Sequence, residues 1–152
     1  MAGKLLTELK QTKPFQSVEQ EAFLNIMKTA DVLQQVAAQI LRGHQMSESQ
    51  YNVLRILRGA GPEGLKCSEI GERMVTRDPD ITRLLDRIEK QGWIERNRST
   101  SDRRVVMTRI TLSGLDKLSE LDAPITESLD RVLGKLGSAK LQTLIDLLEE
   151  VR

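Results

Sequence analysis

The chain has 152 residues and a net charge of +1, and 39% of its residues are hydrophobic against 30% charged. This composition predicts a single globular domain over 1–152 and excludes a disordered chain. The sequence contains no run of about 18 apolar residues and no N-terminal signal stretch, so we expect a cytoplasmic protein that does not enter a membrane.

The N-terminal part of the chain is predicted to be helical. Apolar residues recur there with the spacing of one helical face: Ile26, Ala30, Leu33, Ala37 and Ile40. Leu5, Leu6 and Leu9 add a short apolar tail in front of this helix. These side chains need a partner surface.

A second helix is predicted over 47–58. Ser47 and Gln50 form a capping box, because each side chain can bind the backbone N–H of the other residue. Tyr51, Leu54 and Leu57 then lie on one buried face. A shorter helical pattern follows over 68–74, so two supporting helices precede the most informative segment.

The next helix carries most of the information. One face is apolar: Ile81, Leu84, Leu85 and Ile88. The opposite face is polar: Asp80, Arg83, Arg87 and Lys90. Asp78 is predicted as the N-cap with Pro79 as the first helical residue, and Gly92 as the stop. The fixed start and the two arginines four residues apart are typical of a helix that reads DNA.

Two short strands are predicted after this helix, over 93–96 and 105–110, with turn-forming residues between them. The segment 96–104 holds four arginines and one acidic residue, a local charge of +3. Arginine suits phosphate, and a narrow minor groove attracts it. Charge is uneven along the whole chain, with +3 over 77–115 and −3 over 116–152.

The C-terminal part is predicted to form two amphipathic helices. Their apolar stripes are Leu129, Val132, Leu133 and Leu136, then Leu141, Leu144, Ile145, Leu148 and Val151. Pro124 is expected to kink the first of these helices or to make it restart after Ala123. Gly137 is expected to stop it, and Ser138 to cap the last helix. Residues 46–111 are too few to cover these stripes, so we expect an isologous homodimer.

The fold predicted from these elements is mostly α with a small β-hairpin. A winged helix-turn-helix lobe over 46–111 is flanked by dimerisation helices over 1–45 and 112–152. The segments 68–74, 81–96, 101–104 and 110–114 resemble the MarR (multiple antibiotic resistance regulator) transcription factors, above all in Asp102-Arg103-Arg104 and the spacing from Thr111 to Gly114. The resemblance runs from about 46 to 114.

This resemblance implies a homodimeric, sequence-specific DNA-binding transcriptional regulator. It further implies a repressor that a small aromatic or phenolic effector releases from DNA, with the junctions near Gly43 and 111–112 absorbing the change of shape. Two recognition helices related by a two-fold axis would read a near-palindromic operator in double-stranded DNA, with half-sites ~34–36 Å apart.

The candidate DNA-binding residues lie on two elements. On the recognition helix they are Pro79, Asp80, Thr82, Arg83 and Arg87, and on the wing they are Arg96, Arg98, Ser101, Asp102, Arg103 and Arg104. Arg83 is expected to contact guanine, and Asp80 either to accept from cytosine or to hold Arg83. Arg103 is expected in the minor groove, Arg98 and Arg104 on phosphate, and Asp102 beside the arginines.

Other functions are weaker alternatives. A winged-helix protein-interaction module would more often show apolar or aromatic residues on the exposed helix face. His44 and Cys67 are the only histidine and cysteine, so we expect no Cys/His metal site, no cofactor and no enzyme. Cys67 is a candidate redox thiol or a half-buried structural one. His44 is a surface residue or part of a ligand pocket.

Overall fold

The computed structural model describes residues 3–152 and divides into two compact units, one ending at Val36 and the other spanning Ala37 to Arg152. The first unit contains α1 (Lys4–Glu8) and most of α2 (Val18–Gly43). Leu5 is buried in this unit, whereas Phe23 and Ile26 of α2 are 59% and 45% exposed. The predicted N-terminal helix is confirmed, but part of its apolar face is uncovered within one chain.

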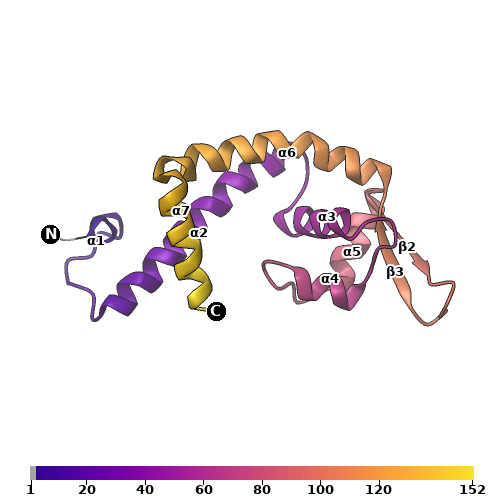
Figure 1. The fold of residues 1–152 in the computed structure, drawn as a ribbon, viewed down its shortest axis with the longest axis horizontal. Coiled ribbons are helices and arrows are strands. Elements are labelled where there is room, and N and C mark those ends of the chain that lie inside the picture. The colour runs from indigo at the N-terminus through magenta and orange to yellow at the C-terminus, as the bar shows by residue number, and fades with distance from the viewer. Residues whose placement is uncertain (1–2) are drawn as a thin grey trace. The chain divides into compact units, whose positions relative to one another are not determined.

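The second unit contains the remaining elements. They are the end of α2, α3 (Glu48–Ala60), β1 (Leu65–Lys66), α4 (Cys67–Arg73), α5 (Ile81–Lys90), β2 (Ile94–Arg98), β3 (Val106–Ile110), α6 (Leu112–Leu133), a 3-10 turn (Gly134–Leu136) and α7 (Gly137–Glu150) (Figure 1). The predicted fold class is confirmed.

The core of this unit lies between α3, α4, α5, the sheet and the first half of α6. Leu57 of α3, Ile70 of α4 and Ile88 of α5 are completely buried in it. Leu118 and Leu121 of α6 are buried in the same cluster. Burial of such side chains contributes roughly 1.5–3 kcal/mol each, so α6 is fastened to the lobe by its own apolar residues.

The sheet is antiparallel and has the order β1-β3-β2. The predicted hairpin is confirmed, with Arg96 of β2 opposite Thr108 of β3, and β2 extends to Arg98. A third strand was not predicted, since β1 has only two residues. Gly64, at φ 73°, lets the chain enter β1, because a Cβ there would collide with the Thr108 carbonyl.

The helix α5 begins two residues later than the sequence predicted. Asp80 is the N-cap, and its Oδ1 accepts a hydrogen bond from the Arg83 amide at 3.1 Å. Asp78 Oδ1 instead accepts from the Asp80 amide at 2.8 Å, which makes a turn that places Pro79 before the helix. The prediction of Asp78 as N-cap is therefore wrong. Gly92, at φ 78°, follows the helix as predicted.

The two C-terminal predictions also need correction. The helix α6 runs through Pro124 to Leu133, so of the two expected alternatives, a kink or a restart after Ala123, the restart is wrong. Burial of Leu121 and Ile125 on both sides of the proline holds the helix together despite the missing N–H. The helix α6 ends at Leu133, before the predicted stop, and Gly137, at φ 74°, is already the first residue of α7. No side chain caps α7, and Ser138 lies inside it.

Two glycine substitutions test this packing in opposite directions. Gly71→Ala should raise the free energy of unfolding by about 0.5–1 kcal/mol, because α4 gains helix propensity and the new Cβ meets nothing within 4 Å apart from its chain neighbours and the backbone of α4. Gly114→Ala should lower it by about 1–3 kcal/mol, because its Cβ would collide with the Trp93 carbonyl. Urea unfolding of both variants at one protein concentration measures the difference, and equal effects would contradict the packing described for α6.

Candidate nucleic-acid interface

The exposed face of α5 carries three of the predicted DNA-binding side chains. Thr82, Arg83 and Arg87 are exposed, while Leu84 and Leu85 anchor the other face in the core. A notch at the N-terminal end of the helix is lined by Asp78, Asp80, Arg83, Leu84 and Arg87. The structure thus gathers acidic and basic groups at the end of the helix that the sequence predicted would meet base edges.

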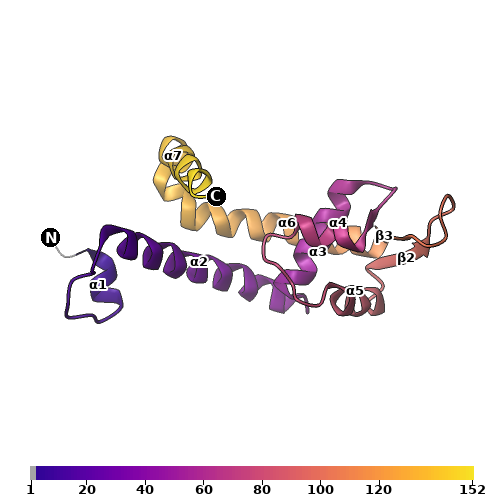
Figure 2. The same cartoon turned by 90° about the horizontal axis from the view of Figure 1, so that it is seen from below.

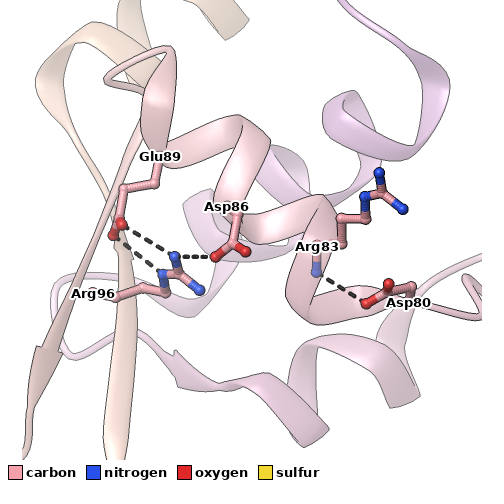
Figure 3. A network of polar contacts seen from close by, with 5 residues as sticks. All are labelled: Asp80, Arg83, Asp86, Glu89 and Arg96. Atoms are coloured by element: carbon pink, nitrogen blue, oxygen red, sulfur yellow. Dashed lines mark hydrogen bonds and ion pairs between the residues drawn. The ribbon is translucent and has the colours of Figure 1, made fainter.

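Figure 3 shows how Asp80 holds Arg83. The Asp80 carboxylate binds the backbone N–H of Arg83, and the Arg83 guanidinium points away from it. Among residues 3–152 no ion pair joins these two side chains. Asp80 therefore fixes the first turn of α5 and leaves the Arg83 side chain available to a ligand.

Arg96 braces the wing against α5. Its Nη2 lies 2.5 Å from Asp86 Oδ1 and 3.1 Å from Glu89 Oε1, and its Nε donates to Glu89 Oε2 at 3.2 Å (Figure 3). The hydrogen bond from Arg96 lowers the pKa of Glu89. Only 21% of the Arg96 side chain is exposed. Both carboxylates bind this guanidinium, so Arg96 holds the wing against α5, and its DNA contact stays a prediction.

The other wing residues divide into those that shape the loop and those that project from it. Arg98 Nη1 donates to the Arg103 carbonyl at 2.8 Å, and Ser101 Oγ lies 2.9 Å from Ser99 Oγ. Asp102 Oδ1 accepts from the backbone N–H of Arg104 at 3.0 Å, which is the positioning role predicted for it.

Arg103 and Arg104 are the projecting residues of the wing. Both are exposed, and the Arg104 side chain is 93% exposed although its Nε lies 3.4 Å from Asp102 Oδ1. Within the described chain, no ion pair holds the Arg103 guanidinium. These two arginines extend the basic surface beyond α5.

Two positioning residues escaped the sequence analysis. Asn52 Oδ1 of α3 accepts from the Val75 amide at 2.9 Å and so fixes the turn between α4 and α5. Thr111 Oγ1 donates to the Gly92 carbonyl at 2.6 Å and accepts from the Gly114 amide at 3.1 Å. The Thr-x-x-Gly spacing in the sequence indicates the hydrogen bond between Thr111 and Gly114. No local sequence pattern indicates the hydrogen bond between Asn52 and Val75.

Ion pairs join α6 to the rest of the second unit. Arg58 of α3 makes a bidentate pair with Asp122, at 2.8 and 3.0 Å, and its hydrogen bonds lower the pKa of that carboxyl. His44 Nδ1 lies 3.5 Å from Glu120 Oε2. Cys67 is the first residue of α4 and is half-buried against the core. His44 therefore lies beside a carboxylate, whereas Cys67 packs against apolar side chains of the core.

None of the described helices combines the length and the apolar content that crossing a bilayer requires.

Comparison with known proteins gives consistent matches. The MarR family model matches residues 46–106. The chain is 38% identical to a MarR transcription factor from Planctomyces limnophilus, over 90% of this chain and 98% of that one, with a TM-score of 0.68. It is 26% identical to the homoprotocatechuate degradative operon repressor of Escherichia coli, over 73% of this chain and 74% of that protein. It is 25% identical to NadR in complex with 4-hydroxyphenylacetate, over 91% and 97%, with a TM-score of 0.72.

The ion pairs of Arg96 should contribute to the stability of the fold. Arg96→Ala should lower the free energy of unfolding by about 1 kcal/mol, because Asp86 and Glu89 lose their common partner in a part-buried setting. Arg104→Ala, the matched control on the same hairpin, should leave stability within about 0.5 kcal/mol of wild type. Thermal unfolding of the two variants compares them directly.

The contribution of Arg96 to the free energy of unfolding should depend on pH. Because Arg96 lowers the pKa of Glu89 in the folded state, its contribution is present above the unfolded carboxyl pKa of about 4.3 and is lost as the pH falls through the lower folded value. The stability difference between wild type and Arg96→Ala should therefore shrink below pH ~4. A difference that stayed constant down to pH ~2 would contradict the brace.

Proposed function

The chain belongs to the MarR family of DNA-binding transcriptional regulators, and we propose that it acts as a homodimer on a near-palindromic operator in double-stranded DNA. The observation that carries the proposal is the division of α5 into a buried apolar face and an exposed face with Arg83 and Arg87. The β2–β3 hairpin lies at the same end of its unit as α5 (Figure 2). Helix and wing together supply the two elements that a winged helix uses on DNA.

We assign the DNA contacts to side chains that project from the protein surface. The major groove is contacted by residues of α5 and the turn before it, namely Pro79, Thr82, Arg83 and Arg87. Arg103 enters the minor groove and Arg104 meets phosphate. Arg98, Ser101 and Asp102 shape the wing loop, because their polar atoms already bind other atoms of that loop. Arg96 positions the wing without touching DNA.

Uncovered apolar residues support the dimer. In the second unit, every residue of α7 is at least partly exposed, and Leu144, Ile145 and Leu147 are 38%, 46% and 57% exposed. In the first unit, Phe23 and Met27 of α2 are 59% and 55% exposed. Such surface is costly to leave in water, and an isologous partner would cover the same residues on both chains. We propose that 1–45 and 112–152 carry the dimer contacts and 46–111 the DNA contacts, with the first half of α6 also packed on the winged lobe.

We further propose that this regulator is a cytoplasmic repressor and that a small aromatic or phenolic molecule releases it from DNA. Two relatives support this effector class, one a homoprotocatechuate degradative operon repressor and one a protein in complex with 4-hydroxyphenylacetate. No enzymatic activity, metal or cofactor forms part of the proposal. His44 is a candidate for the effector site, and Cys67 is assigned a packing role.

A protein-interaction module is the second candidate function. It would need an exposed apolar surface where α5 and the wing project, but exposed arginines occupy that place. DNA binding is therefore the better-supported proposal.

DNA binding can be measured with a fluorescent duplex taken from upstream of the protein's own gene, titrated against salt beside a scrambled duplex. Wild type should prefer the native duplex. Arg103→Ala should weaken that binding by about 1–3 kcal/mol, and Arg83→Ala should do the same while relaxing sequence preference. Arg104→Ala, as a phosphate contact, should mainly reduce the salt slope. Absence of binding to either duplex at low salt would favour the protein-interaction module.

The dimer can be measured by light scattering at micromolar concentration. The expected mass is twice the 17.2 kDa of one chain. Ile145→Glu should shift the mass towards one chain, because it would place a carboxylate in the proposed apolar contact. Thr143→Glu adds the same charge at an exposed position on the opposite side of α7 from Ile145 and serves as the control. A wild-type mass of about one chain would contradict the dimer.

A further inference from the structure

The Asp80 carboxylate lies in the notch where two guanidinium groups are proposed to meet DNA. Its Oδ1 is committed to the Arg83 amide at 3.1 Å. No side chain among residues 3–152 donates to its Oδ2. A carboxylate facing DNA is repelled by the phosphates, so it weakens binding to every sequence unless a base offers it a donor. A base that donates a hydrogen bond to Asp80 is therefore needed to offset this repulsion.

The major groove limits the answer. A carboxylate only accepts hydrogen bonds, and the base donors in that groove are cytosine N4 and adenine N6. The arginine fork pairs best with guanine, whose O6 and N7 are both acceptors. A G·C pair shows these acceptors and the cytosine donor side by side, which an A·T pair does not.

The first turn of α5 carries a hydrogen-bond acceptor and a hydrogen-bond donor that are complementary to the two bases of a G·C pair. Asp80 and Arg83 are three residues apart at the first turn of α5, and both line the notch. The capping bond fixes the Asp80 carboxylate at the turn from which the Arg83 side chain leaves, and the Arg83 guanidinium points away from it (Figure 3). Acceptor and donor can thus meet two different bases without first breaking a pair between them.

We propose that Asp80 and Arg83 together read one G·C base pair in each half-site. Asp80 accepts from cytosine N4 while Arg83 donates to O6 and N7 of its guanine. The inference rests on the proposed function and names a base pair that the operator must contain. Asp80 acts as a specificity residue through a penalty, since every other base pair at that position leaves its carboxylate unpaired or Arg83 facing a donor or a methyl group.

Asp78 provides a matched control. It carries the same charge two residues away and lines the same notch. Its Oδ1 accepts from the Asp80 amide at 2.8 Å, and the residue is half-buried. Asp78→Asn therefore removes the same negative charge from nearly the same place without removing the proposed base contact.

The test is selection from a randomised duplex library by the full-length protein, in wild type, Asp80→Asn, Asp78→Asn and Arg83→Ala. Asparagine keeps the N-cap of α5, and Asp80→Ser supplies a second neutral cap in case Asp80→Asn unfolds. Wild type should enrich a near-palindrome with a strongly preferred G·C pair in each half. Asp80→Asn should lower the discrimination at that pair on the order of tenfold and strengthen binding to a scrambled duplex. Arg83→Ala should erode the same pair, whereas Asp78→Asn should strengthen all binding and leave every preference unchanged.

The outcomes separate this inference from the function on which it rests. Unchanged preferences in Asp80→Asn, or a profile equal to that of Asp78→Asn, would overturn the role of Asp80. Loss of preference at two different pairs in Asp80→Asn and Arg83→Ala would overturn the shared base pair. Failure of folded wild type to enrich any sequence, with no binding at low salt, would overturn sequence-specific DNA binding itself.

Discussion

The geometry of the interface depends on a close backbone contact between the turn after α5 and the start of α6. Thr111 donates through its amide to the Trp93 carbonyl at 3.0 Å and through its hydroxyl to the Gly92 carbonyl at 2.6 Å. Gly114 lies so near the same Trp93 carbonyl that a side chain does not fit. The end of the recognition helix is thereby tied to the first turn of α6, and any motion of α6 there must carry α5 with it.

This contact restricts which part of the chain can move when the conformation changes. From the sequence we expected the junctions near Gly43 and at 111–112 to absorb such a change, but in the structure hydrogen bonds and close packing hold the second of them. A little further along α6, Asp122 pairs with Arg58 of α3 and Leu121 is buried in the core. The first half of α6 therefore belongs mechanically to the winged lobe. In the proposed dimer, we therefore expect an effector to act beyond this part of α6, on its C-terminal half or on the partner's helices.

Most of the fold could be predicted because apolar periodicity reports burial directly. The stripe on α5 and the capping box at Ser47 appear in the structure as the sequence indicated. The start of α5 could not be fixed locally, because Asp78 and Asp80 are both good caps and only the turn between them decides which one is used. The strand β1 is too short to leave a periodic signal.

The candidate site was harder to predict than the fold, because the use of each charge depends on partners distant in sequence. The sequence placed Arg96 and Arg98 on the same DNA-binding wing as Arg103 and Arg104. In the structure Arg96 is held by Asp86 and Glu89, and Arg98 binds a carbonyl of its own loop.

This division of charge explains how a chain of net charge +1 can present a basic surface to DNA. Arg96 pairs with both Asp86 and Glu89 of α5, so one of their two negative charges is compensated close to the arginines that remain free. The acidic surplus of the chain lies after residue 115, outside α5 and the wing. What matters for association is the local potential of α5 and the wing loop, and the net charge of the chain says little about it.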